Sequence, residues 1–472
     1  MDGLVKVKII ATLGPSSRDH DVVKKMVREG AAGFRINCAH GDEADWLEYV
    51  KIVREVSSEL DQAIPLILDT PGPQVRSGDF QEFKVVRGDK VLFSMDPDAK
   101  EGKHIVVPAR EFYSAASIGD TILYGDGEVS FRVSEVGEGF VEALALNEGV
   151  VKPRKKVVVE GKEYDVLFPS ETDRRVFKFS SEVKASFVAL SYVRRQRDVE
   201  VARDILAKHG WVPGLIAKIE TRSGFNNMGE IIRLVDGVMV ARGDLGLHFP
   251  LEELPLIQER IVREAVRQGR VVIVATEVLE SMIENPRPSR SDVVDLYNSV
   301  KDLVDAVLFT NETAVGKYPV EVVKWARKII DAAESSLSTA LVSEYRSSIE
   351  ARDLLDKYVQ GLVLLAESLG GVIVGYSRSG RMPTLLSKYR PQIRIYVGVG
   401  DKLLAEKLSL RYGLNIVDMS RLISGEDEYE RGVRKLLETL VGKGHVRPGD
   451  IVVETYAKPR DNMHEIRISQ LQ

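Results

Sequence analysis

The stretch LIAKIET at residues 215–221 and the nearby VMVARGDLG at residues 238–246 organise the whole chain. Each begins as a short apolar run, typical of a buried strand, and ends in charged residues. Side chains alternate in direction along a strand, so Lys218 and Glu220 share one face. Charges at the ends of adjacent buried strands are costly unless they hold a ligand or one another.

The second stretch adds a further cation and a further acid. Arg242 and Asp244 share a face in the same way if the strand continues that far. Glu220 and Asp244 offer the carboxylate oxygens that Mg²⁺ and Mn²⁺ prefer, and Gly243 would allow a ligand close to the backbone. Lys218 would stabilise a phosphoryl group in transfer or an enolate. The alternative interpretation is an ion-pair network without a ligand.

Composition indicates an ordinary globular protein. The chain has 472 residues, enough for about two to four domains, and 44% of them are hydrophobic and 29% charged. A net charge of −5 does not favour a nucleic-acid partner. The single cysteine, Cys38, excludes an intrachain disulfide, and no leader or apolar run of about 20 residues is recognisable. We therefore expect a cytoplasmic protein with no membrane partner.

Hydrophobic periodicity predicts three parallel-sheet units near the N-terminus. Strands are expected at residues 7–13, 33–37 and 65–69, with helices at 19–30 and 43–60 between them. Short β runs separated by Gly, Asp and Pro then replace helical periodicity. They predict a small β-barrel lid domain at residues 72–166, inserted after the third strand. Its expected strands are residues 90–94, 105–107, 121–124, 129–133, 140–146 and 155–159.

The α/β rhythm returns after this insertion with five further strands, so that the total is eight. Eight β-then-α units predict a (β/α)8 TIM barrel made of residues 1–71 and 167–335, with its ligands at the carboxyl ends of the strands. The later strands are expected at residues 187–192, 215–220, 235–242, 271–276 and 304–310. The polar residues at strand ends are Arg35, Asn37, Asp69, Thr70, Lys218, Glu220, Arg242, Asp244, Thr276, Thr310 and Glu312.

Residues 336–472 are expected to form a third domain, an open-sheet α/β unit. The serine-rich residues 335–348 at its start look like a helix end followed by a connection. Within this domain the segment GYSRSGR at residues 375–381 lies between a strand and a helix, where backbone amides and hydroxyls make a phosphate cradle. Taken alone, that segment is only a glycine-containing turn.

Motifs spread over the whole barrel resemble those of the pyruvate kinase family, and they occur in the same order and spacing. The inserted β domain falls where the family has its own, and the C-terminal domain is also similar to the family, though less closely. The stretches that carry the resemblance are IATLGPSSR at 10–18, FRINCAHG at 34–41, LDTPGP at 68–73, AKIE at 217–220, MVARGDLG at 239–246, ATEVLESM at 275–282, PRPSR at 286–290 and ETA at 312–314.

The resemblance implies transfer of a phosphoryl group from phosphoenolpyruvate to ADP, followed by protonation of enolpyruvate to pyruvate. Glu220 and Asp244 match the family's divalent-metal ligands. Lys218 matches the lysine that stabilises the phosphoryl group in transit. Arg35 and Arg76 match arginines at the phosphate end of the site, where forked guanidinium groups suit phosphate oxygens.

Further matches concern the carboxylate and nucleotide ends of the site. The backbone of residues 242–244 (Arg242, Gly243 and Asp244) and the hydroxyl of Thr276 match groups that hold the substrate carboxylate near the protonation site. Asn37 and His40 join Arg76 on the nucleotide side. The alternatives are an ordinary β-branched strand residue for Thr276 and a loop or cap residue for His40.

Asn37, Asp69 and Thr70 match the family's potassium site, but the chain departs from the pattern around it. Ala39 stands where a serine ligand is usual, and Gln74 stands where potassium-dependent members carry glutamate. The need for K⁺ is therefore open. Pro71 in place of lysine, and Thr310-Asn311 in place of Ser-Gly, leave the route of the proton open as well.

Two more groups of residues follow from the resemblance. The basic residues 154–156 of the inserted domain either reach nucleotide phosphates or form a solvated edge strand. The family binds phosphorylated effectors at the loop matching residues 377–381, so a sugar phosphate or nucleotide is expected there, and a homotetramer is expected as well. The residues of this effector site are Ser377, Arg378, Ser379, Gly380 and Arg381.

Two rival functions remain at this point. One is a barrel lyase or aldolase that uses Mg²⁺ to stabilise an enolate; the inserted lid and Arg35 with Arg76 argue against it. The other is a catalytically silent sensor of phosphorylated metabolites. Retention of Lys218, Glu220 and Asp244 argues against that, because a silent site is free to lose its charges.

Overall fold

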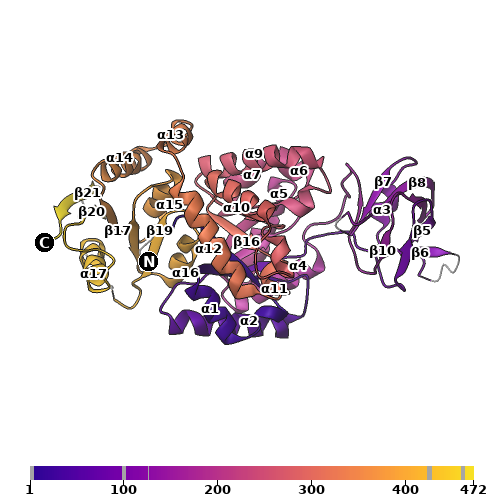
Figure 1. Cartoon of the computed structure of the whole chain (residues 1–472), viewed down its shortest axis with the longest axis horizontal. Coiled ribbons are helices and arrows are strands. Elements are labelled where there is room, and N and C mark those ends of the chain that lie inside the picture. Colours follow the sequence, from indigo (N-terminus) through magenta and orange to yellow (C-terminus); the bar gives the residue numbers. More distant parts are fainter. Residues whose placement is uncertain (1–4, 98–101, 126, 423–427, 459–462) are drawn as a thin grey trace.

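The computed structural model describes residues 5–97, 102–125, 127–422, 428–458 and 463–472. Three units lie in a row, with a closed barrel between an inserted β unit and a C-terminal α/β unit (Figure 1). The barrel strands are all parallel, in the order β1-β16-β15-β14-β13-β12-β3-β2, which confirms the predicted (β/α)8 barrel. Their bounds are β1 Lys8–Leu13, β2 Ala31–Asn37, β3 Leu66–Asp69, β12 Phe187–Leu190, β13 Gly214–Ile219, β14 Gly237–Ala241, β15 Val271–Ala275 and β16 Ala306–Phe309.

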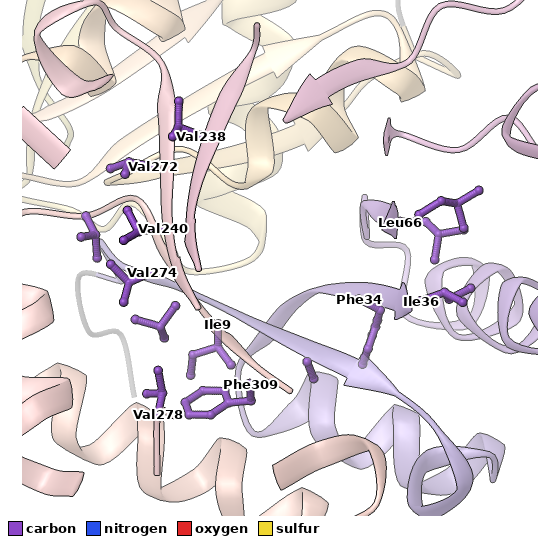
Figure 2. Close-up of a cluster of buried hydrophobic side chains, with 14 of the residues drawn as sticks. Ile9, Phe34, Ile36, Leu66, Val238, Val240, Val272, Val274, Val278 and Phe309 are labelled. Atoms are coloured by element: carbon purple, nitrogen blue, oxygen red, sulfur yellow. The ribbon is translucent and has the colours of Figure 1, made fainter. Parts of the chain in front are cut away.

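Alternation along these strands builds two apolar layers. Ile9 of β1 packs outward in the large core between the strands and the helices, together with Phe34, Val238 and Phe309 (Figure 2). The next residue, Ile10, packs inside the barrel, so the strands are buried on both faces. The covering helices are α1 His20–Arg28, α2 Glu43–Glu59, α4 Glu171–Glu182, α5 Gln196–Lys208, α7 Met228–Leu234, α9 Leu254–Arg267, α10 Arg290–Lys301 and α12 Pro319–Ser335.

The inserted unit differs in closure from the small barrel that its sequence predicts. Its described strands form an open six-stranded sheet, β11-β7-β8-β9-β5-β6, and a separate β10-β4 pair. Both strands of that pair have only three residues, and neither pairs with the edge strands β11 and β6, so the sheet is not closed. The elements are β4 Phe83–Val85, β5 Lys90–Ser94, β6 Lys103–Val106, α3 Arg110–Ala115, β7 Thr121–Tyr124, β8 Val129–Gly137, β9 Phe140–Ala145, β10 Gly149–Val151 and β11 Val157–Val159.

The C-terminal unit is the predicted open sheet, in the order β19-β18-β17-β20-β21, with only β21 antiparallel among its described strands. The serine-rich segment contains a helix, α13 (Thr339–Ser347), where a connection was expected. Ser338 explains the difference, because its side chain accepts a hydrogen bond from the backbone N–H of Leu341 and caps the helix. The other elements are α14 Leu354–Ser368, β17 Val372–Tyr376, α15 Arg381–Lys388, β18 Ile395–Val399, α16 Lys402–Ser409, β19 Leu414–Asp418, α17 Glu428–Gly442, β20 Ile451–Lys458 and β21 Met463–Gln470.

Among the described residues, no helix is both long enough and apolar enough to cross a membrane.

Candidate active site

Charged side chains meet at the carboxyl ends of the barrel strands, as predicted. Lys218, near the end of β13, points along the barrel interior. Its Nζ lies 2.8 Å from Oε1 of Glu220 and 3.3 Å from Oδ1 of Asp69. It also donates a hydrogen bond of 2.8 Å to the hydroxyl of Ser191. The shared face of Lys218 and Glu220 is therefore present, and it brings a third residue, Asp69, from β3.

Ser191 was assigned no role from the sequence, although it directly follows strand β12. Its hydroxyl accepts from Lys218, donates to the carbonyl of Thr70 at 2.6 Å, and lies 3.4 Å from Asp69 Oδ1. Position was the available signal, because Ser191 falls at the end of a predicted barrel strand where ligand-handling residues gather.

Glu220 is fully buried, and its two oxygens have different partners. Oε2 accepts a hydrogen bond of 2.8 Å from the backbone N–H of Tyr192. Among the described residues, Oε1 has only the Lys218 ammonium beside it. Burial raises the pKa of Glu220 from 4.5 to about 7, with a further contribution from Asp244 and with Lys218 opposing both. A carboxylate so short of partners is suited to receive a cation.

Asp244 and Arg242 do not share a face, and this part of the expectation is wrong. Strand β14 ends at Ala241, and residues Arg242–Leu245 form the short helix α8. In a helix, side chains two positions apart point about 200° apart rather than to one side. Arg242 therefore turns away, donating to Asp295 at 2.7 Å and to the carbonyl oxygens of Thr276 and Glu277.

Asp244 instead faces the inserted unit. Its Oδ1 lies 2.6 Å from Nζ of Lys156, which belongs to the basic residues 154–156. Burial would raise the pKa of Asp244, but Lys156 and Lys218 outweigh it and hold that pKa below its ordinary value. The ammonium of Lys156 thus lies beside Asp244, where the metal ion was predicted. Its neighbours match the solvated-edge alternative, because Arg154 pairs with Asp79 at the surface and Lys155 lies 3.6 Å from Glu128.

Arg35, the residue expected at the phosphate end of the site, belongs to β2. Its Nε donates to Asp69 Oδ2 at 2.6 Å, and its Nη1 donates to Thr12 at 3.2 Å. The guanidinium is nearly buried, with a side-chain exposure of 9%. Lys218 has its pKa raised above the ordinary value, because Asp69, Glu220 and Asp244 together outweigh burial. Lys218 therefore keeps its charge inside the barrel mouth.

Thr276 follows β15 with a positive φ of 69°, rare for a β-branched residue. Its hydroxyl accepts a hydrogen bond of 2.9 Å from the backbone N–H of Gly243. Strained backbone of this kind persists where the surroundings enforce it, often at functional sites. The hydroxyl hydrogen of Thr276 has no acceptor among the described residues, so it is available to a ligand.

The residues expected on the nucleotide side lie next to one another. Arg76 donates to the carbonyl of Arg154 at 3.1 Å and to Gln74 Oε1 at 2.9 Å, so it belongs to the hinge between barrel and inserted unit. Burial, followed by Arg76 and Arg35, lowers the pKa of His40 below 6.5. His40 is therefore close to both arginines and neutral at physiological pH.

The predicted potassium ligands already have partners. Both oxygens of Asp69 face cations, Arg35 and Lys218. Asn37 Oδ1 accepts from the backbone N–H of Ala39 at 3.2 Å, and Thr70 Oγ1 accepts from that of Ser191 at 3.3 Å.

Within the described ranges, no group of three or more His, Cys, Asp or Glu side chains is arranged to hold a metal ion. Glu220 and Asp244 are close enough for Asp244 to raise the pKa of Glu220. Two carboxylates suit Mg²⁺ or Mn²⁺, which usually retain water or substrate oxygens as their other ligands. The residues therefore fit a divalent cation completed by the substrate.

The predicted effector loop is not part of this site; it lies in the C-terminal unit between β17 and α15. Its hydroxyls organise the turn: Ser377 accepts from the N–H of Gly380 at 3.1 Å and Ser379 from that of Arg381 at 3.4 Å. Gly380 has a φ of 76°, and an added Cβ would lie 2.7 Å from Leu404, so only glycine suits the position. Arg381 pairs with Asp353 at 2.5 Å.

Comparison with known proteins gives one consistent family. The family description "Pyruvate kinase, barrel domain" matches residues 4–323, and "Pyruvate kinase, alpha/beta domain" matches residues 359–466. A pyruvate kinase of Aeropyrum pernix is 37% identical over 99% of both chains, and one of Thermotoga maritima is 33% identical over 96% of both. The crystal structure of pyruvate kinase from Pyrobaculum aerophilum superposes with a TM-score of 0.84 and 32% identity, covering 99% of both chains.

Proposed function

This chain belongs to the pyruvate kinase family and transfers a phosphoryl group between phosphoenolpyruvate and ADP; on that premise we propose how its residues divide the reaction. The supporting observation is the cluster of Lys218, Glu220, Asp69 and Arg35 at the mouth of the barrel. Family membership favours this function over the lyase and the silent sensor.

The family depends on a divalent metal, and we assign Mg²⁺ or Mn²⁺ to Glu220 and Asp244 in this chain. When bound, the ion supplies positive charge that offsets the charge of the phosphoryl oxygens and of the enolate. Lys156 of the inserted unit would have to leave Asp244 for that carboxylate to hold the ion, because its ammonium lies 2.6 Å from Oδ1. The position of the inserted unit would thereby affect binding of the divalent ion.

Lys218 and Arg35 act on the phosphoryl group. Both are buried cations held by Asp69, which fixes their positions before the substrate arrives. Preorganised positive charge in a water-poor site stabilises developing negative charge without reorganisation. Lys218 therefore faces the group being moved, and Arg35 binds its oxygens.

The carboxylate end of the substrate is assigned to the backbone of residues 242–244 and to Thr276. The N–H of Gly243 is already directed at the Thr276 hydroxyl, which can pass a hydrogen bond onward to the substrate. The side chain of Arg242 has a positioning role, because it holds the carbonyl oxygens of Thr276 and Glu277.

The nucleotide side is assigned to Asn37, His40 and Arg76, with residues 72–166 as a lid over it. We further propose that the reaction proceeds without K⁺. The carboxylate of Asp69 is neutralised by Arg35 and Lys218, and Gln74 brings no charge to the position where dependent members carry glutamate. Pyruvate is the product on this assignment, and phosphoenolpyruvate and ADP are the substrates.

Three further proposals rest on the family resemblance. Residues 377–381 bind a phosphorylated effector, the chain assembles as a homotetramer, and it works in the cytoplasm. Residues 1–71 with 167–335, 72–166 and 336–472 are its three domains. Light scattering of the purified protein tests the tetramer, since a monomeric mass contradicts it.

An activity assay tests the assignment of the reaction and of the cations together. Purified protein is given phosphoenolpyruvate, ADP and Mg²⁺ in tetramethylammonium buffer, and pyruvate is measured with and without added K⁺. We expect pyruvate in both buffers at rates within about twofold, and none when the divalent metal is chelated. A rate that appears only with K⁺ contradicts the proposed independence, and pyruvate formed without ADP contradicts the phosphoryl transfer.

A further inference from the structure

A second charged cleft lies at the opposite end of the barrel, between the amino-terminal ends of the strands and the C-terminal unit. Its volume is about 300 Å³. Asp236 and Arg270, which precede β14 and β15, come from the barrel side. Lys407 and Arg411, from α16 and the turn after it, come from the other side. The volume is within the range of small-molecule sites.

Cations outnumber acids in this cleft. Arg270, Lys407 and Arg411 line it together with Arg381, which pairs with Asp353 outside the cleft, and Asp236 is the one acidic residue among its lining residues. Asp236 also accepts the backbone N–H of Leu215 at 2.8 Å, so its carboxylate is only partly available to the cations. With Arg381 neutralised by Asp353, the rest of the lining carries an excess of two positive charges.

These cations have few partners of their own. Arg411 is 8% exposed and makes one hydrogen bond among the described residues, from Nη1 to the carbonyl of Gly269 at 3.0 Å. Arg270 donates through Nη2 to the carbonyl of Arg233, while its Nε is buried and lacks an acceptor in the described part of the chain. Lys407 forms no ion pair with any described carboxylate.

The pKa values of Arg270, Lys407 and Arg411 are all lowered, which also indicates that these cations lack a counter-charge. Burial lowers the pKa of Arg411 from 12.5 to about 10, and it also lowers those of Arg270 and Lys407. In each case Asp236 opposes the shift without cancelling it. Buried cations with lowered pKa values lack a counter-charge that a bound anion would supply.

The cleft is held in a fixed shape from the α16 side. Leu410 inserts into the core inside the barrel and is fully buried. The next residue but one, Tyr412, donates its backbone N–H to Asp305 Oδ1 at 2.8 Å, and Gly413 donates to the carbonyl of Lys6. Lys407 and Arg411 are therefore anchored against the barrel rather than free to move into solvent.

We propose that this cleft binds the phosphate group of a small phosphate monoester. A phosphate monoester dianion carries the two negative charges that the lining lacks. Phe187 and Leu404 form an apolar wall beside the cations, suited to the organic part of the ligand. The inference rests on the effector role proposed above for residues 377–381, because Gly380 and Arg381 form one edge of the cleft. It places the phosphate on the barrel side of that loop.

The location connects the ligand with the catalytic end. Asp236 directly precedes β14, whose other end leads into Asp244, and its partner Leu215 lies in β13, which carries Lys218. Five strand residues span roughly 17 Å, so the two sites are separate but share two strands.

Calorimetric titration with inorganic phosphate at pH 8 and constant ionic strength tests the cleft, with the full-length protein and its variants. Lys407→Gln and Arg270→Gln are each expected to weaken phosphate binding about tenfold or more, because a charged hydrogen bond is lost. Lys402→Gln is the matched control: it removes an exposed lysine of α16 outside the cleft and is expected to leave the affinity unchanged. Neither cleft variant should change kcat in the absence of phosphate.

Arg378→Gln distinguishes failure of this inference from failure of the effector proposal. Arg378 belongs to the loop but does not line the cleft. If Arg378→Gln weakens binding while Lys407→Gln and Arg270→Gln do not, the phosphate binds elsewhere on the loop and the cleft assignment is wrong. If none of the three weakens it, both the cleft and the effector loop are wrong.

Discussion

The two ends of the barrel treat buried charge in opposite ways. At the carboxyl ends of the strands, Lys218, Arg35 and Lys156 face Asp69, Glu220 and Asp244 at distances of 2.6–3.3 Å. At the amino ends, Arg390 and Asp305 form a closed pair, and the cleft beside them holds cations in excess. The charges are balanced at the first end and unbalanced at the second.

This difference indicates whether each end of the barrel must break an internal ion pair when it binds a ligand. A balanced cluster must release an internal partner when a ligand binds, as Lys156 must release Asp244. An unbalanced cluster can accept an anion without losing a partner. The Arg390–Asp305 pair does neither, because both side chains are no more than 2% exposed and the forked contact is complete at 2.7 and 3.1 Å. It is a structural joint between the barrel and the C-terminal unit.

The largest expected effect is at the catalytic end. Lys218→Met removes the cation that we propose faces the transferring group, while keeping most of the length of the side chain. We expect kcat to fall by about 10³-fold, because preorganised charge at a developing anion is worth that much. Steady-state assay of pyruvate formation measures it. Lys208→Met, at an exposed position of α5, is the control and should retain full activity.

Asp305→Asn should affect stability and leave the chemistry unchanged. The substitution leaves Arg390 buried with an uncompensated charge, which costs on the order of 3–5 kcal/mol of unfolding free energy. Denaturant unfolding measures the loss, and kcat of the folded variant should stay near the wild-type value. Asp331→Asn removes a surface pair with Arg327, worth less than about 1 kcal/mol. Equal losses in both variants would show that the joint has no special role.

Glu220→Gln tests the metal site and its pH dependence. In the folded protein the pKa of the Glu220 carboxyl is raised from 4.5 to about 7. Between these pH values the carboxyl is therefore protonated in the folded protein and ionised in the unfolded chain. Its contribution to stability is therefore full below about pH 4.5 and is lost as the pH rises through 7. A metal needs the ionised form, so Mn²⁺ affinity should rise from pH 6 to pH 8.

In the variant we expect Mn²⁺ binding at pH 8 to weaken on the order of 10–100-fold and its pH dependence to flatten. Calorimetry in the absence of substrates measures both. Glu182→Gln, at the exposed end of α4, serves as the control. An unchanged pH profile in Glu220→Gln contradicts the assignment of this carboxylate to the metal.

The smallest expected effect comes from Lys156→Gln. Removing the ammonium that occupies Asp244 should tighten Mn²⁺ binding about threefold to tenfold without nucleotide, because the metal no longer displaces a cation. The same calorimetry applies. Lys155→Gln, whose partner Glu128 is at the surface, should show no change. Weaker binding in Lys156→Gln would mean that this lysine assists the metal rather than competing with it.

Much of the fold was predictable because its signals are local. Alternating short apolar runs and amphipathic segments specify parallel strands with covering helices, and eight such units leave a closed barrel as the favoured arrangement. Weak local signals were missed. Strands β4 and β10 have three residues each, and helix α13 lies in a serine-rich segment in which Ser338, just before the helix, is its cap.

The residues that reach the barrel mouth could be predicted from the sequence alone, since polar residues that directly follow the buried strands of a barrel lie at the carboxyl ends of those strands. Lys218, Glu220, Asp69 and Arg35 meet there as expected. Their partners, in contrast, depend on how the units pack in three dimensions. Strand β14 ends at Ala241, so Arg242 belongs to helix α8 and points away from Asp244. Lys156 of the inserted unit pairs with Asp244. Hydrophobic periodicity reports the direction of each side chain along its own element, whereas charge pairing depends on which elements meet in space.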